Sequence, residues 1–396
     1  MKFTGTITHL SQKGLGVVKN AQNNMSYFVY GTWPGDVGEF EVIDKSFNNK
    51  KFAFAKLTRL IQPSVQRQTP PCPHVDISLA EKACTGCPWM IADCTSQLEQ
   101  KRKRFVYALQ RAGFDISQLD IGPVHPSPQL YGYRNRCQLK TDGEQLGFIS
   151  EDSYQIAPIS DCIVLNDACR KLLETALRQL PNPAWQASAN DKWSSIELDD
   201  DMQSGEICTN RKRPFKQGNP QQNDRMRAWL KEKLAHNPRL GKVVELFCGS
   251  GNFTPIIAAS NCSEVIAYES DDQAVQTLRA KNLDKVTVHT TDLFNPLVWR
   301  KLQKHVHDAE TLVLDPPRAG LKKHQGFFSS FAALRTILYI SCNPETFARD
   351  AWFFHQNDWT INDIQLIDLF PHTPHIEILA EFEKLNTTNR KYWRRH

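Results

Sequence analysis

Residues 243–253 read VVELFCGSGNF, an apolar run that ends in two closely spaced glycines. The run has the length of a buried strand, and Gly249 and Gly251 let a ligand approach the backbone where that strand ends. Helix-like stretches separate it from further apolar runs, at residues 264–269, 286–292, 311–315 and 336–341. This alternation predicts an α/β fold with a doubly wound parallel sheet over residues 215–396.

Acidic residues follow the glycine turn in a regular order. Glu269 ends the second strand, Asp292 the third and Asp315 the fourth. Each acid alone could be a helix cap, but a carboxylate at the end of the second strand is also the group that binds ribose hydroxyls. The third glycine of a dinucleotide fingerprint is missing. The combined pattern therefore favours a site for S-adenosylmethionine over a pyrophosphate cradle.

The N-terminal part of the chain has a different pattern. Residues 1–62 contain short segments of alternating apolar and polar residues, separated by glycines. Short strands at this spacing predict a small OB-like β-barrel, a fold that often binds RNA. Residues 63–214 mix short strands with loops and predict a separate central domain. A helix expected near residues 94–114 could pack with the C-terminal domain.

The composition permits an RNA partner. The 396 residues carry a net charge of +5, and basic runs occur at residues 101–104, 211–213 and 389–396, although such runs are more often solvated faces. The first residues do not resemble a secretory leader, and no stretch approaches the ~18 apolar residues of a membrane span. We therefore expect a cytoplasmic protein without membrane contact. Nothing in the sequence indicates an obligate protein partner, and we expect a monomer.

Four of the eleven cysteines form a candidate metal site. Cys84 and Cys87 make a CxxC motif, Cys72 lies upstream and Cys162 lies far downstream. Zinc is the usual partner of four such thiols. A redox pair is less favoured, because no strand–helix pattern surrounds the motif. Most of the remaining cysteines are expected to pack in the core: Cys137, Cys169, Cys208, Cys248 and Cys262.

Four motifs in order resemble one family, the RNA uracil-C5 methyltransferases that make 5-methyluridine. They are ELFCGSGNF (245–253), LDPPRAG (314–320), YISCNP (339–344) and FPHTPHIE (370–377). PFKQGNP (214–220) fits a further motif, and the N-terminal barrel, called TRAM in the family, extends the resemblance over nearly the whole chain. The resemblance implies a Rossmann-like methyltransferase domain over residues 215–396. The barrel and the cysteines resemble the branch that modifies 23S ribosomal RNA.

The resemblance also implies roles for individual residues. C5 of uracil is a poor nucleophile until a thiolate adds at C6, and the matching thiol is Cys342. Glu377 matches the base that removes the C5 proton, and Asp315 or Arg318 would contact the uracil or the cofactor. The residues that match S-adenosylmethionine ligands are Gln217, Phe247, Asn252, Glu269, Asp292 and Asp315.

In this family a [4Fe–4S] cluster is held by cysteines at the positions of Cys72, Cys84, Cys87 and Cys162. The gap between Cys72 and Cys84 is longer than usual for the family, so Cys94 is an alternative fourth ligand. The cluster, S-adenosylmethionine and large-subunit ribosomal RNA are the partners that the resemblance implies.

Several alternatives remain. The protein could be a transfer-RNA uridine-5 methyltransferase, or an RNA-binding protein that kept the fold without the activity. An RNA cytosine-C5 methyltransferase would carry its nucleophilic cysteine directly after Pro316-Pro317, where this chain has Arg318. A metal triad of His372, His375 and Glu377 is disfavoured, because prolines interrupt the helix that such sites use.

Overall fold

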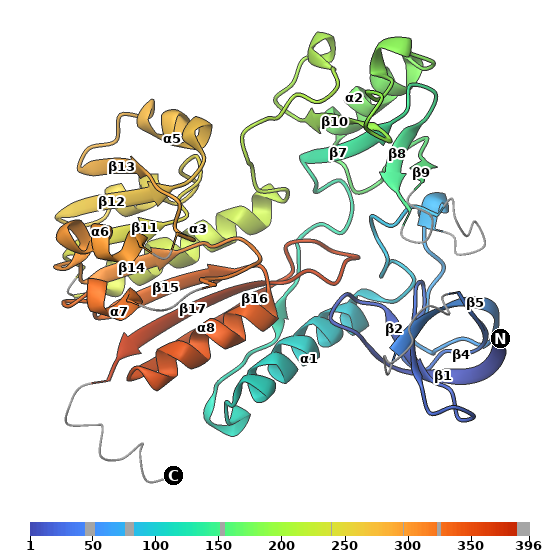
Figure 1. Cartoon of the computed structure of the whole chain (residues 1–396), viewed down its shortest axis with the longest axis horizontal. Helices are drawn as coiled ribbons and strands as arrows, with labels where there is room; N and C mark the ends of the chain where they lie inside the picture. Colours follow the sequence, from blue (N-terminus) through green and yellow to red (C-terminus); the bar gives the residue numbers. More distant parts are fainter. Residues whose placement is uncertain are drawn as a thin grey trace. The chain divides into compact units, whose positions relative to one another are not determined.

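A computed structural model describes residues 1–43, 52–75, 83–150, 155–238, 240–295, 297–322 and 326–385 (Figure 1). The chain forms two compact units. The first comprises residues 1–101, 129–212 and 370–374, and the second comprises residues 102–128, 213–369 and 375–396. The barrel and the central region, which the sequence pattern separates near residue 62, thus fall into one unit. The basic tail at residues 389–396 lies outside the described residues.

The predicted N-terminal barrel is confirmed. Its strands close in the order β1-β2-β3-β5-β4, with every neighbouring pair antiparallel except β3 and β5. The bounds are β1 Lys2–Leu10, β2 Gly16–Lys19, β3 Ser26–Val29, β4 Val37–Val42 and β5 Phe52–Gln62. The alternation seen in the sequence places Phe3, Ile7, Val18, Tyr27 and Phe40 in the barrel core.

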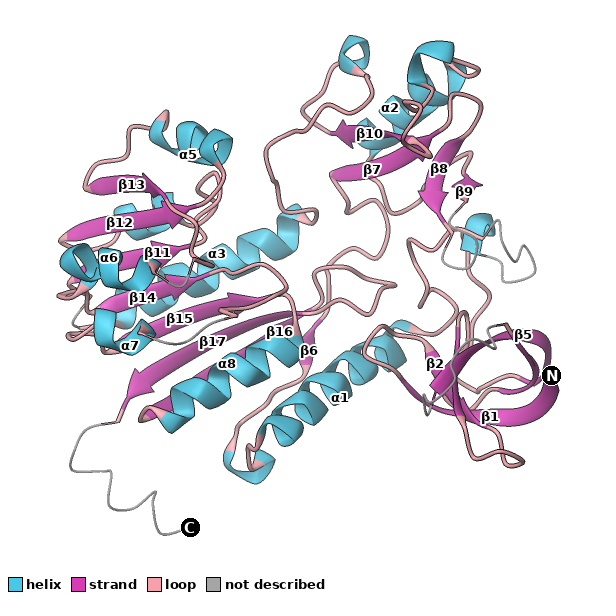
Figure 2. Cartoon of the chain, in the orientation of Figure 1, coloured by secondary structure: helices cyan, strands magenta, loops and turns pink. Residues whose placement is uncertain are grey.

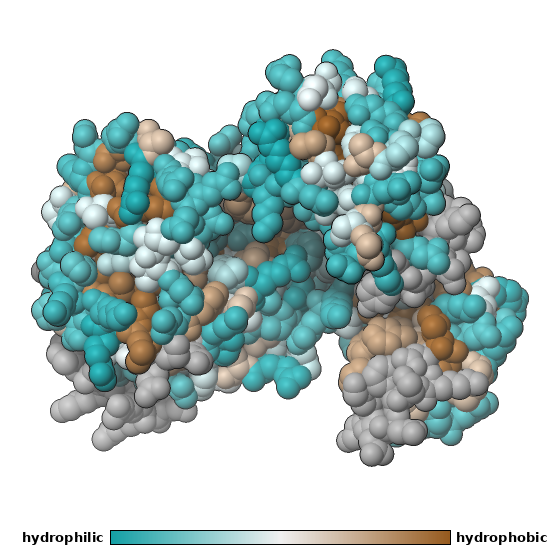
Figure 3. Space-filling model, turned by 45° about the horizontal axis from the view of Figure 1, so that its top comes forward, coloured by the Kyte–Doolittle hydropathy of each residue, from teal (hydrophilic) through white to brown (hydrophobic). Residues whose placement is uncertain are grey.

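Apolar side chains also reach the outside of the barrel. Phe52 and Phe54 on β5 are 39% and 37% exposed, and the ring of Phe28 on β3 lies 5.3 and 5.8 Å from theirs. In the space-filling view, brown and tan residues come to the surface of the barrel at the lower right (Figure 3). The barrel therefore carries a small exposed aromatic group on two adjacent strands.

A buried carboxylate ties the barrel to the linker that follows it. Asp36 is fully buried, and its carboxylate accepts hydrogen bonds from the backbone N–H of Trp33 (2.6 Å) and of Ser64 (2.9 Å). The same carboxylate accepts one from Nε of Arg67 (2.8 Å), and Arg67 also donates to the carbonyl of Gly31 (2.7 Å). One side chain therefore satisfies donors from a turn of the barrel and from the linker.

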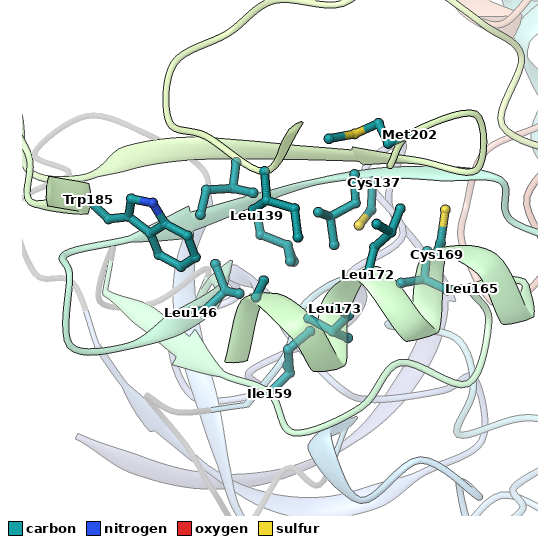
Figure 4. Close-up of a cluster of buried hydrophobic side chains, with 14 of the residues drawn as sticks. Cys137, Leu139, Leu146, Ile159, Leu165, Cys169, Leu172, Leu173, Trp185 and Met202 are labelled. Carbon is teal, nitrogen blue, oxygen red and sulfur yellow. The ribbon is translucent and has the colours of Figure 1, made fainter. Parts of the chain in front are cut away.

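The central sheet of the first unit has the order β10-β7-β8-β9, entirely antiparallel. Its strands are β7 Arg136–Thr141, β8 Leu146–Ile149, β9 Ile156–Pro158 and β10 Ser194–Asp199, and it packs on helix α2 Asp167–Arg178. Figure 4 shows Cys137 and Cys169 among the leucines of this core, as expected for packing cysteines. Cys208 is exposed, so its predicted packing role is wrong.

The second unit contains the predicted parallel sheet, extended at one side. Its eight strands run in the order β13-β12-β11-β14-β15-β17-β16-β6 (Figure 2). The five parallel strands are β11 Lys242–Leu246, β12 Glu264–Glu269, β13 Val286–Thr290, β14 Thr311–Leu314 and β15 Thr336–Ser341. Two later strands extend the sheet, β16 Trp359–Ile367 and β17 Glu377–Lys384, which are antiparallel to each other. The earlier strand β6 Val124–His125 pairs with β16 at the edge of the sheet.

Helices connect these strands (Figure 2). They are α3 Pro220–His236, α4 Thr254–Ala258, α5 Asp272–Arg279, α6 Val298–Val306, α7 Phe327–Ser330 and α8 Pro344–Gln356. Helix α1 Cys94–Ala112 starts in the first unit and enters the second at Arg102. Within the second unit, Arg104 of α1 donates to both carboxylate oxygens of Glu345 on α8 (2.9 and 2.7 Å). None of the helices in the described residues has the length and apolar character needed to cross a membrane.

Residues 370–374 return to the first unit, where buried polar groups hold them. The backbone N–H of His372 donates to the Gln97 side chain (3.0 Å), and its carbonyl accepts from the N–H of Trp89 (2.9 Å). The buried Lys101 donates to the carbonyl of Phe370 (3.1 Å). His372 has a φ of 66°, a strained value for a residue with a side chain. These contacts explain how a strained turn persists immediately before β17.

We predict that Asp36→Ala destabilises the protein by about 3 kcal/mol, because it removes a buried ion-pair partner and leaves two backbone donors unsatisfied. Urea denaturation would measure the free energy of unfolding. The control is Glu41→Ala, which removes an exposed ion pair with Lys56 and should cost below about 1 kcal/mol. Equal effects of the two substitutions would show that the Asp36 network does not stabilise this unit.

Candidate active site

The glycine motif after β11 forms a tight turn in the left-handed region of backbone space. Phe247, Gly249 and Gly251 have φ values of 64°, 54° and 83°. Phe247 is strained there, whereas glycine adopts such angles without cost. A Cβ on Gly251 would lie 2.4 Å from the side chain of Leu278, but a Cβ on Gly249 would meet nothing within 4 Å. Gly249 therefore borders open space at the carboxyl end of the strand.

Glu269 is connected directly to this turn. The parallel register pairs Leu246 with Tyr268, so Glu269 ends β12 at the level of the glycine motif. One carboxylate oxygen of Glu269 accepts a hydrogen bond from the N–H of Gly249 (3.0 Å), and the other accepts from the N–H groups of Ser270 and Asp271 (2.6 and 3.0 Å). The structure thus brings together the first acid and the glycine turn, as the sequence pattern predicted.

The other predicted cofactor residues differ in how they connect to this turn. Asp292 follows β13 and accepts from the N–H of Phe294 (2.9 Å), whose ring centre lies 5.7 Å from that of Phe247. The amide of Asn252 exchanges two hydrogen bonds with Asn223 of α3 (2.8 and 3.1 Å). Gln217 is half-buried in the loop before α3, and among the described residues it makes no hydrogen bond to the other five.

Strand register places Glu377 opposite Cys342. In the antiparallel pair β15–β17, Ser341 faces Ile378, so the next pair outward is Cys342 and Glu377. Asp315 follows β14, which lies beside β15 on its other side. Cys342 is half-buried and Glu377 is 4% exposed. The thiol and two carboxyls therefore meet at the carboxyl end of the parallel strands, where such sheets bind ligands.

The electrostatics of this group favour neutral forms. Burial, with smaller contributions from Glu377 and Asp315, raises the pKa of the Cys342 thiol to about 12, while Arg318 acts to lower it. Burial also raises the pKa of Glu377 well above its ordinary value, helped by Asp315 and opposed by Arg318. The pKa of Asp315 rises to about 7 through burial and the nearby Glu269. Arg318 is thus the positive charge that favours ionisation of both the thiol and Glu377.

Three features of the site were not predicted from the sequence. Nη2 of Arg318 lies 3.2 Å from Nε2 of His375, which precedes Glu377 by two residues. Glu245 is buried within β11, and burial raises its pKa to about 8. Asn223 supports Asn252 from α3, and nothing in its local sequence indicates this contact.

The metal triad of His372, His375 and Glu377 is not supported. His372 belongs to the first unit, is fully buried and has its Nδ1 3.3 Å from the amide nitrogen of Gln97. Burial and the positive charge of Lys101 together lower its pKa to about 4. His372 is therefore a neutral structural residue that stacks on the ring of Tyr131 at 5.1 Å.

The four predicted cluster cysteines come together in the first unit. Cys72, Cys84, Cys87 and Cys162 line one pocket, whose wall also contains Arg134, and Cys94 is not among its lining residues. Burial raises the pKa of all four thiols, to about 12 for Cys84, and the charge of Arg134 acts in the opposite direction on three of them: Cys84, Cys87 and Cys162. The pocket therefore gathers the thiols predicted from the CxxC motif, with Cys72 rather than Cys94 as the fourth.

The spacing of these thiols bears on which metal they suit. In the described part of the chain, the one group of three potential ligands whose atoms all lie within 4.8 Å of one another is Asp199, Asp200 and Asp201. No three of the four cysteine sulfurs are that close. Around a single zinc ion, with Zn–S distances of ~2.3 Å, they would be ~3.8 Å apart. The observed arrangement is wider than a single-ion site.

Comparison with known proteins identifies the family. The tRNA (uracil-5-)-methyltransferase family model matches residues 203–384. An uncharacterized RNA methyltransferase of Nitrosomonas europaea is 57% identical over 97% of both chains. A 23S rRNA (uracil(1939)-C(5))-methyltransferase of Francisella tularensis subsp. novicida is 25% identical over 97% of both chains.

A solved structure shows the same fold. The tRNA (uracil-54, C5)-methyltransferase of Pyrococcus abyssi, in complex with S-adenosyl-L-homocysteine, aligns with a TM-score of 0.67 over 96% of this chain and 100% of that one, at 21% identity. The second unit accordingly has the Rossmann-like fold of S-adenosylmethionine-dependent methyltransferases. With its glycine turn, strand-end acids and paired Cys342 and Glu377, the chain belongs to the RNA uracil-5-methyltransferase family.

Proposed function

We propose that the protein methylates C5 of a uridine in 23S ribosomal RNA through a covalent bond between Cys342 and C6 of the base. The observation that carries the proposal is the register of β15 and β17, which sets Cys342 opposite Glu377. Both residues stand at the strand end that also carries the glycine turn and Glu269. A nucleophile, a base and a cofactor site are the parts that this reaction requires.

The residues around the glycine turn fit S-adenosylmethionine. Gly249 faces open space, and Glu269 next to it can accept hydrogen bonds from ribose hydroxyls. Phe247 and Phe294 offer aromatic surface beside the turn, which suits an adenine ring. When bound, S-adenosylmethionine supplies a methyl group on a sulfonium that a carbon nucleophile can attack.

The chain's own residues perform the remaining steps. The Cys342 thiolate adds to C6, and the electron pair of the C5–C6 double bond moves toward C5 and the O4 carbonyl. C5 then takes the methyl group, whose bonding electrons stay on the sulfur so that S-adenosylhomocysteine leaves, and C5 still carries its proton. Glu377, ionised at that stage, removes this proton, the electron pair re-forms the double bond, and Cys342 leaves as thiolate. Arg318 favours the charged forms of both residues.

We expect Cys342→Ala to abolish methyl transfer and to leave S-adenosylmethionine binding intact, because the thiol acts on RNA alone. Glu377→Gln should leave the enzyme joined to methylated RNA, since the proton on C5 then stays in place. Denaturing gels with radiolabelled RNA would show the adduct as a slow band, and the double variant should show none. The matched control is the exposed Cys208→Ala, which should methylate normally. Normal turnover by Glu377→Gln would disprove this mechanism.

The pocket of four thiols fits a [4Fe–4S] cluster, which we propose as a second cofactor. Four thiolates are the usual ligands of such a cluster, and the sulfurs are spaced more widely than one zinc ion requires. Arg134 in the pocket wall offsets part of the negative charge that four thiolates would gather. Phe370 packs against the same group of residues, so the cluster would also support the returning segment before β17.

Protein purified without oxygen should contain about four irons per chain and absorb broadly near ~400 nm. Cys72→Ala should lower the iron content, because Cys72 lines the pocket. Cys94→Ala is the matched control and should leave it unchanged, since Cys94 lies outside the pocket lining. Iron would be measured by mass spectrometry of the intact protein and by elemental analysis. One zinc and no iron from iron-replete cells would rule out the cluster.

Ribosomal RNA is favoured over transfer RNA by the likeness to the Francisella 23S rRNA enzyme along the whole chain. The barrel offers a contact surface for such RNA, because exposed aromatic rings stack on unpaired bases. Among the described residues of the barrel, the phenylalanines with exposed rings are Phe52 and Phe54 on β5.

Large-subunit RNA fragments should therefore be methylated faster than unmodified transfer-RNA transcripts.

Replacing Phe52 and Phe54 together by alanine should weaken binding of large-subunit RNA fragments by about 1–3 kcal/mol per stacked base, without changing cofactor affinity. Fluorescence anisotropy with labelled fragments would measure the binding. Thr58→Ala, an exposed residue of the same strand, is the control. Faster methylation of transfer RNA would favour the alternative substrate.

A further inference from the structure

Helix α8 holds the loop that carries Arg318. The helix begins at Pro344, directly after Cys342 and the cap residue Asn343, whose side-chain oxygen accepts from the N–H of Glu345 (3.0 Å). The amide nitrogen of the same Asn343 donates to the carbonyl of Arg318 (3.1 Å). The hydroxyl of Thr346 donates to that carbonyl as well (3.0 Å). The N-terminal turn of α8 and its cap therefore bind the carbonyl of Arg318. The same turn fixes Asn343, the residue next to Cys342.

Asp350, one turn further along α8, also binds the backbone of this loop. Its carboxylate is fully buried and accepts from the N–H of Leu321 (2.9 Å) and the hydroxyl of Tyr339 (2.8 Å). It also accepts two hydrogen bonds from the guanidinium of Arg349 (2.9 and 2.7 Å), which in turn donates to the carbonyl of Ala319 (2.9 Å). Asp350 thus holds the loop at Leu321 directly and at Ala319 through Arg349.

The loop also fits closely against this helix. Gly320 has a φ of 64°, and a Cβ there would lie 2.4 Å from the Asp350 carboxylate and 2.6 Å from the Arg349 guanidinium. Each residue from Arg318 to Leu321 therefore contacts the same stretch of α8. Tyr339, which also bonds to Asp350, is three residues before Cys342 on β15. The nucleophile strand, the helix after it and the Arg318 loop share one buried acceptor.

We propose that Asp350 is a positioning residue for the methyl-transfer reaction: it locks the Arg318 loop onto α8 so that the guanidinium stays beside Cys342 and Glu377. This inference rests on the proposed covalent mechanism. Asp350 is fully buried, so it acts through the backbone of residues 318–321. Thr346 is a second positioning residue, which acts on the carbonyl of Arg318 itself.

The charges around Cys342 make the effect measurable as a shift in pH dependence. The groups that act on the thiol are Glu377 from β17, Asp315 after β14 and Arg318 in the loop, and Arg318 is the one that lowers the pKa. If the loop loosens and Arg318 moves away, the thiol ionises at higher pH. The rate of adduct formation rises with pH as the thiolate forms, so its midpoint should move upward. A general loss of stability would not move this midpoint.

Asp350→Asn is the first test, because it keeps the size of the side chain but places an NH2 donor where one of the two accepting oxygens stands. Adduct formation would be followed on RNA containing 5-fluorouridine, whose fluorine blocks the final elimination and isolates the Cys342 step. We expect the rate to fall on the order of 10²-fold, as for a reacting group displaced by ~1 Å, with the pH midpoint raised. The KM for S-adenosylmethionine should stay at the wild-type value while kcat falls.

Thr346→Val gives a second test that leaves the buried charge in place. It should produce a smaller loss, about 10-fold (~1.4 kcal/mol), and a shift of the pH midpoint in the same direction. The control is Thr311→Val, which removes a buried hydroxyl at the start of β14, bonded to the carbonyl of Leu240. That variant should lose stability and keep the wild-type pH midpoint.

Circular dichroism would show whether Asp350→Asn folds, and if it does not, Thr346→Val decides. The inference is overturned if the folded variants form the adduct with the wild-type rate and midpoint, or if Thr311→Val shifts the midpoint equally. If wild-type enzyme forms no adduct with 5-fluorouridine RNA, the covalent mechanism itself fails, and the inference fails with it. That outcome is distinct because it concerns the wild type rather than the variants.

Discussion

The antiparallel pairing of β17 with β15 is the constraint on which the site depends. Parallel strands bring their carboxyl ends to one edge, and these ends carry the glycine turn, Glu269 and Asp315. In the proposed mechanism, the base has to reach that edge from a later part of the chain. Because β17 runs the opposite way, its first residue, Glu377, arrives there and faces Cys342. One reversal of strand direction thus completes the site.

Burial at that edge has an electrostatic consequence. Cys342, Glu377 and Asp315 all have raised pKa values, because each is desolvated and each carboxyl disfavours further negative charge nearby. Burial therefore favours the neutral form of the Cys342 thiol. Arg318 is the opposing charge, and it stands on a loop with no strand to hold it. The hydrogen bonds from Asn343, Thr346 and Asp350 supply the rigidity that the loop lacks.

The first unit combines three separate stretches of chain by burying polar groups. Asp36 joins the barrel to its linker, and Gln97 and Lys101 hold residues 370–374. Each of these three groups is costly to bury alone, and each has partners from another segment. Four cysteines from two distant parts of the central region also line one pocket. The pairing of the three polar groups explains why the barrel and the central region form one compact unit, although their sequence patterns differ.

The sequence by itself determined much about this protein, because local pattern and motif order carry that information. Alternating short segments predicted the barrel, the strand–helix alternation predicted the parallel sheet, and motif order indicated Cys342, Glu377 and the strand-end acids. Tertiary structure alone decided which distant groups meet. Local sequence does not indicate the division into two units, nor that Cys72 rather than Cys94 lines the thiol pocket. It also does not indicate the hydrogen bonds between Asn223 and Asn252, or the one from Leu321 to Asp350. Such contacts arise from packing and from satisfying buried donors and acceptors, which depend on the whole fold rather than on neighbours in the chain.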